Sequence, residues 1–160
     1  MAPALKMLLR DYKDRLQMAY RFDNVLCTHA GVSTDFMDSV FGKDGWSEDN
    51  IVELLNEQWK YKPLTFGFAE MCNTERLINP YGDNVQQSPL WIRSKSLMNS
   101  NYHTLRKKFI QVVGHTPQRK IDIKGMATGG RYYFIDTFNV GSEYLVYEDG
   151  KFSVNNLEKE

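Results

Sequence analysis

Two histidines stand where the chain could present them to a ligand. His29 follows the apolar run VLCT and precedes Ala30-Gly31, and His115 follows the apolar run IQVV and Gly114. Short apolar runs of this kind are typical of buried strands. Ligands of α/β sheets collect beyond the carboxyl ends of the strands, so the two imidazoles are expected to meet at one metal ion. Taken singly, each histidine is more often an ordinary strand-end residue than a ligand.

Three helices are expected around these strands. Residues 4–21 and 47–60 carry apolar side chains at helical spacing with charges between them. Ser33 and Thr34 favour the start of a short helix that ends at Phe41, because their hydroxyls can accept a backbone hydrogen bond. Residues 63–90 contain prolines and glycines that interrupt every pattern, which predicts a long irregular connection with one helical stretch.

The strands fall into two groups. Residues 25–28 and 109–113 are the apolar runs that precede the histidines, and RYYFIDT (131–137) follows a Gly-Gly turn. Near the carboxyl end, residues 143–147 and 151–154 flank Asp149-Gly150, which is a strong hairpin signal. Together with the helices, these strands predict an α/β fold.

Composition limits the kind of protein and its partners. The chain has 160 residues, 42% of them hydrophobic, and 20 basic residues balance 20 acidic ones. A balanced charge disfavours nucleic acid or an anionic membrane as a partner, and no apolar run reaches the length of about 20 residues that spans a bilayer. Two cysteines make no disulfide framework, and no signal peptide is recognised, so a cytoplasmic location is expected.

Four strings occur in an informative order: THAGVS (28–33), SPLWIR (88–93), VVGHTP (112–117) and FIDT (134–137). In order and approximate spacing they closely resemble the carboxyl-terminal half of the calcineurin-like metallophosphoesterases, nearest to the bacterial and phage Ser/Thr protein phosphatases. The resemblance implies about half of that family's four-layer α-β-β-α sandwich, a mixed sheet with flanking helices, forming one partial domain over residues 1–160.

The resemblance also assigns roles. It implies that His29 and His115 ligate the second of two metal ions, which would be Mn, Fe or Zn, and that Arg93 binds the substrate phosphate. A guanidinium fork fits phosphate oxygens in a bidentate manner. The implied substrate is a phosphoprotein or a small phosphoester. Ser/Thr phosphatases and dinucleotide hydrolases both use these motifs, and SPLWIR modestly favours the former.

The family's amino-terminal motifs, G-D-x-H, G-D-x-x-D-R-G and G-N-H-E, do not occur. The one Gly-Asp pair, Gly82-Asp83, is followed by Asn84-Val85. We therefore expect the chain to be the carboxyl-terminal half of a two-metal phosphomonoesterase, inactive alone and with weak or absent metal binding. Its partner would be the missing amino-terminal half or a second copy. The alternative is a non-catalytic interaction module, a degenerate or split phosphatase fragment that binds a partner chain.

Three further residues have expected roles in or near the site. Phe138 stands where the family usually has glycine after I-D-T, which brings the packing of the last strands into question, and Asp136 is expected to be structural or to support a metal ligand. Cys27 is two residues before His29 and, with His115, could form a zinc site, although a buried cysteine is more often inert packing. The third histidine, His103, is expected on the surface.

Overall fold

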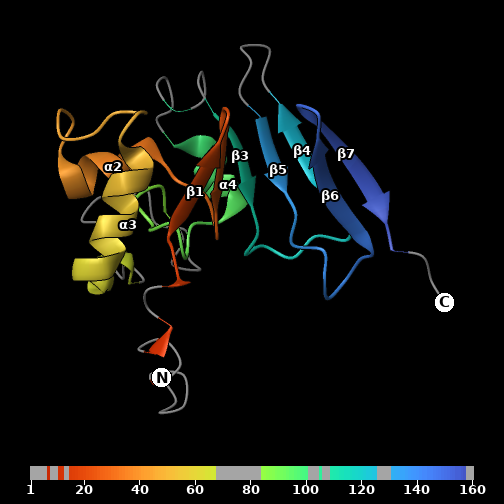
Figure 1. The fold of residues 1–160 in the computed structure, drawn as a ribbon, viewed down its shortest axis with the longest axis horizontal. Helices are drawn as coiled ribbons and strands as arrows, with labels where there is room; N and C mark the ends of the chain where they lie inside the picture. The colour runs from red at the N-terminus through yellow and green to blue at the C-terminus, as the bar shows by residue number, and fades with distance from the viewer. Residues whose placement is uncertain are drawn as a thin grey trace.

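The chain is described here from a computed structural model that covers residues 7, 11–12, 15–67, 84–100, 105, 109–125 and 131–157. Within these residues it is α/β, with a five-stranded sheet, a separate two-stranded sheet and three α-helices (Figure 1). In chain order the elements are β1 (Ala19–Phe22), β2 (Val25–Thr28), α2 (Thr34–Phe41), α3 (Ile51–Tyr61), the 3-10 helix η2 (Pro63–Phe66), α4 (Ser94–Asn99), β3 (Ile110–Val113), β4 (Asp122–Gly125), β5 (Arg131–Phe134), β6 (Glu143–Glu148) and β7 (Lys151–Asn156).

The larger sheet is mixed, as expected. Its strand order is β1-β2-β3-β5-β4, in which β2, β3 and β5 run parallel and the outer strands β1 and β4 run antiparallel to their neighbours. The smaller sheet is the predicted hairpin β6–β7, closed by Asp149-Gly150 with both residues at positive φ. A mixed α/β fold is therefore confirmed.

The prediction that the first helix extends to residue 21 is wrong. Much of residues 4–21 lies outside the described residues, but Ala19–Phe22 is the strand β1. It forms a tight hairpin with β2 in which Phe22 is paired with Val25. The Asn56 side chain from α3 also holds this segment, since it accepts from Met18 N and Ala19 N and donates to Ala19 O. These long-range hydrogen bonds outweigh the local helical pattern.

The other helices follow the sequence more closely. Helix α2 has Ser33 as its N-cap, with the hydroxyl accepting from Phe36 N, as predicted. Helix α3 begins at Ile51 and not near Ser47, because the Asn50 side chain accepts from the Ser47 amide and closes a turn ahead of the helix. In the connection 63–90, η2 is the one helical stretch among the described residues. Strand β4 and helix α4 were not predicted.

One face of the five-stranded sheet carries the helices. Leu26 of β2 packs there in a buried cluster with side chains of α2 and α3. Val113 and Phe134 pack in a second buried cluster with Leu97 of α4. Strand residues alternate between faces, so Leu26, Val113 and Phe134 share the helix-covered face and their neighbours point the other way. The helices thus fix the positions of the strands that lead to the site.

The hairpin β6–β7 packs on the opposite face. The Phe152 ring stacks on Tyr133 with centroids 4.4 Å apart, and Tyr147 lies edge-on to Phe22 at 4.8 Å. The Tyr147 hydroxyl donates to the Asp23 carboxylate at 2.7 Å. Aromatic contacts therefore attach the hairpin to part of this face. Among the described residues, no helix has both the length and the apolar character needed to cross a bilayer.

Candidate metal centre

The two histidines lie together at the carboxyl edge of the sheet. Strands β2 and β3 are parallel and adjacent, so the residues that follow them leave the sheet at the same edge. His29 Nε2 and His115 Nδ1 are 3.1 Å apart, and the two rings meet edge to face with centroids at 5.0 Å. The sequence predicted that the two imidazoles meet, and this separation is short enough for both to bind one ion.

His115 adopts a backbone conformation that is rare for a residue with a side chain. Its φ is 66°, and the amide of Thr116 donates to the carbonyl of Gly114 at 2.8 Å. This is a three-residue γ-turn centred on His115, and its positive-φ form is strained. Strain of this kind persists where the surrounding structure imposes it, most often at functional sites. The turn directs the imidazole back toward His29.

Backbone hydrogen bonds tie together the four segments that carry the sequence motifs. The amide of Gly114 donates to the carbonyl of His29, and the amide of Ala30 donates to the carbonyl of Pro89, at 2.8 and 2.7 Å. On the other side, the amide of Gln118 donates to the carbonyl of Asp136 at 2.8 Å. Segments that are far apart in the sequence therefore converge on one edge of the sheet.

The environment of His115 favours a neutral imidazole. Burial lowers its pKa, and the charges of His29 and Arg93 lower it further, while a hydrogen bond to the Trp91 backbone and the Asp136 charge oppose the shift. Nε2 of His115 is itself buried without a hydrogen-bond partner of standard geometry, so the contact with the Trp91 backbone is a weak one. A neutral ring keeps a lone pair for a metal ion.

Arg93 lies close enough to His115 for its charge to lower the pKa of that ring. It immediately precedes α4 and is exposed, and its charge acts on His115. The Trp91 ring stands edge-on to the His115 ring, with centroids 6.1 Å apart. The segment that carries Arg93 therefore borders the histidine pair. An arginine beside the imidazole pair is suited to binding an anion.

The glycines beside the histidines allow close packing. At Gly31, a Cβ would lie 2.3 Å from Cδ2 of Leu97. The φ of Gly31, 106°, is also unfavourable for other residues. Gly31 therefore allows the loop after His29 to pack on α4. At Gly114, a Cβ would lie 3.4 Å from the carbonyl of His29, so this glycine mainly allows the two loops to approach one another.

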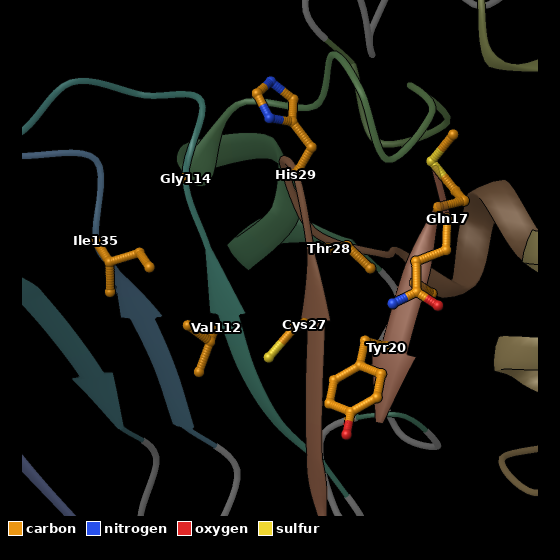
Figure 2. A pocket seen from close by; sticks show the side chains of 10 residues that line it. Gln17, Tyr20, Cys27, Thr28, His29, Val112, Gly114 and Ile135 are labelled. Atoms are coloured by element: carbon orange, nitrogen blue, oxygen red, sulfur yellow. The ribbon is translucent and has the colours of Figure 1, made fainter. Parts of the chain in front are cut away.

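A hollow of 330 Å³ runs from the histidine edge along the sheet face that lacks helices (Figure 2). Figure 2 shows Cys27 and Val112 on the floor of this hollow, with Tyr20 on one side and His29 at its upper end.

Burial raises the pKa of the Cys27 thiol, which makes it a poor thiolate ligand. Within the described residues no group of three His, Cys, Asp or Glu side chains could hold a metal, so a zinc site through Cys27 has no support.

Phe138, which stands where the resembled family usually has glycine, does not disturb the site. Its side chain is 88% exposed and points to solvent. The preceding Thr137 is buried, and its hydroxyl donates to the carbonyl of Glu143 at the start of β6. Asp136 acts on His115 through its charge, which agrees with a supporting role. His103 lies outside the described residues.

Gln111 lies beside the site and was not predicted from the sequence. Gln111 of β3 is buried, and both atoms of its amide are bonded to the backbone of Val32, three residues after His29. A glutamine inside the apolar run FIQVV was the available signal, because a buried amide requires partners.

Comparison with protein-family models, with curated proteins and with solved structures finds no match to this chain. The function is therefore inferred from the site.

Proposed function

We propose that this chain supplies the two-histidine side of the metal site of a phosphomonoesterase, with phosphoproteins as the favoured substrate class. The observation that carries the proposal is the 3.1 Å approach of His29 Nε2 to His115 Nδ1 at the carboxyl edge of a mixed sheet. Arg93 beside them would bind a phosphate group. The four motifs that suggested this family from the sequence are the segments that meet there.

The donor set fits a divalent ion. Two nitrogens bound to one ion at about 2.1 Å are about 3.0 Å apart at a right angle and about 3.4 Å apart at a tetrahedral angle. The observed 3.1 Å lies between these two values, so the pair could hold Mn, Fe or Zn. When bound, such an ion polarises a phosphoryl oxygen and lowers the pKa of a water molecule. His29 and His115 would hold the ion, and Arg93 would orient the phosphate.

Metal titration of three histidine variants tests this assignment. We expect one Mn²⁺ to bind weakly per chain in calorimetry, and His29→Ala or His115→Ala to weaken binding by about tenfold or more. The matched control is His103→Ala, which removes the third histidine and should leave binding unchanged. Equal affinity of the wild type and His115→Ala would overturn the assignment.

Catalysis by this chain alone should be undetectable. The motifs that supply the bridging carboxylate and the catalytic histidine of the resembled family are missing from the sequence. General acid catalysis alone contributes about 10²–10⁴-fold. We expect no turnover of an aryl phosphate above background with millimolar Mn²⁺. Turnover that His115→Ala abolishes would show that ligands from elsewhere, such as a second copy of the chain, complete the site.

The second candidate function is a non-catalytic module that binds a partner chain. Its support is the apolar hollow, in which Tyr20 is 53% exposed beside the half-buried Cys27 and Val112. Asn56 also occupies both backbone groups of Ala19 in β1, so part of this sheet edge is closed to strand pairing. Exposed apolar patches mark interaction surfaces.

Analytical sedimentation tests the proposal that the chain is a partner-binding module. If the hollow is an interface, the chain should self-associate at high concentration and bind an apolar dye, and Tyr20→Lys should reduce both effects. Tyr144→Lys on the hairpin is the matched control, because Tyr144 is 45% exposed but does not line the hollow. A monodisperse wild-type monomer without dye binding would contradict the interface.

A further inference from the structure

Gln111 links the two histidine-bearing segments through its side chain. It lies in the middle of β3 and is only 2% exposed. Its Oε1 accepts from the amide of Val32 at 2.9 Å, and its Nε2 donates to the carbonyl of Val32 at 3.0 Å. One amide side chain thus satisfies both backbone groups of a residue 79 positions away in the sequence.

Strand β3 and the residue after it therefore hold the His29 loop at two points. Val32 is bound by Gln111, and the carbonyl of His29 is bound by the amide of Gly114 at 2.8 Å. His115 is the next residue after Gly114. The loop 29–32 is thus bracketed by contacts from the same segment that presents the second imidazole. A shift of the loop relative to β3 would change the distance between the two rings.

We propose that Gln111 is a positioning residue that sets the separation of His29 and His115. Its amide is bonded to Val32, and it acts on the two rings through the loop that carries His29. Val32 is 1% exposed, so without the Gln111 amide its N–H and C=O would be buried and unpaired. Unpaired buried backbone groups are unfavourable, and the loop would move to pair them with water. As far as metal binding is concerned, this inference rests on the proposed function.

The test compares two variants that each remove an amide bonded to the backbone. Gln111→Met keeps the size of the side chain, and Asn56→Leu removes the equivalent contact with Met18 and Ala19. In the metal-free protein, nuclear Overhauser contacts between the two imidazole rings and fixed ring tautomers should be present in the wild type and in Asn56→Leu. Both should be lost in Gln111→Met. Retention of both in Gln111→Met would overturn the proposal.

Metal affinity gives a second readout. Gln111→Met should weaken Mn²⁺ binding by about 10- to 100-fold, the usual effect of losing support for a metal ligand, while Asn56→Leu leaves it unchanged. If the wild type binds no Mn²⁺, the proposed function fails, but the ring contacts in the metal-free protein still decide the role of Gln111.

Hydrogen exchange of the wild type covers the case in which Gln111→Met does not fold. The amide of Val32 should exchange as slowly as the amide of Gly114, because both N–H groups are hydrogen-bonded between the same two segments. Exchange of the Val32 amide at the rate of an open loop would show that the Gln111 contact does not hold the loop, and would overturn the proposal.

Discussion

The two faces of the five-stranded sheet differ in how completely they are covered. On the helix-covered face, Leu26, Val113 and Phe134 are almost fully buried beneath α2, α3 and α4. On the other face, the hairpin β6–β7 reaches Tyr133 through Phe152, while Val112 stays half-buried in the open hollow. The same strands therefore contribute one side to a packed core and the other to an accessible surface.

This difference explains where the candidate site obtains its rigidity. The loops that carry His29 and Arg93 are anchored toward the covered face, through Gly31 packed against Leu97 and Val32 bonded to Gln111. Closely packed interiors transmit any change in volume to their neighbours. The open face lacks such anchoring contacts around the hollow, which Val112 and Cys27 line. Variants on the two faces should therefore behave differently.

The largest expected effect is at Gly31. Gly31→Ala would add a Cβ against Leu97 at a φ of 106°. Overpacking and the positive φ together should lower the free energy of unfolding by about 2–5 kcal/mol. The control on the hairpin is Gly150→Ala, where φ is 76° but no atom lies within 4 Å of the added Cβ, so strain alone should cost about 1–2 kcal/mol. Urea denaturation measures both, and equal losses would contradict the contrast.

An intermediate effect on stability is expected when either of two consecutive valines of β3 is replaced by alanine. Val113→Ala removes methyl groups from the covered face and should lower the free energy of unfolding by about 2–3 kcal/mol. Val112→Ala removes the same atoms from the floor of the open hollow and should cost about 1 kcal/mol. The same denaturation experiment compares them. If Val112→Ala were the more damaging change, the hollow would be part of a closed core.

The smallest expected effect is the contribution of His115 to the pH dependence of stability. The pKa of His115 is lower in the folded state than in the unfolded chain, mainly through burial. The unfolded chain therefore binds the proton first, and stability should decline as pH falls below the unfolded value of about 6.5. His115→Gln removes this contribution. Denaturation midpoints at about pH 7.5 and about pH 5.5 should differ less in the variant than in the wild type. An unchanged difference would show that other groups cause the acid sensitivity.

Prediction from the sequence succeeded where a local signal was strong. Ser33 marked the N-cap of α2, Asp149-Gly150 marked the turn of the hairpin, and the apolar runs before His29 and His115 marked β2 and β3. It failed at Ala19–Phe22, where a helical pattern is overridden by pairing with β2 and by the Asn56 side chain. Local patterns carry no information about such distant partners, which is why the structure departs from them there.

The sequence by itself determined the chemistry that is available: two imidazoles placed after apolar strands, and an arginine in SPLWIR. The tertiary structure decided that these groups meet, because β2 and β3 are adjacent and parallel and end at one edge. It also decided the strained turn at His115 and the contact of Gln111 with Val32, which joins residues 79 positions apart. Residue types follow from the chain alone, whereas distances between them arise only when distant segments pack and satisfy their buried hydrogen-bonding groups together.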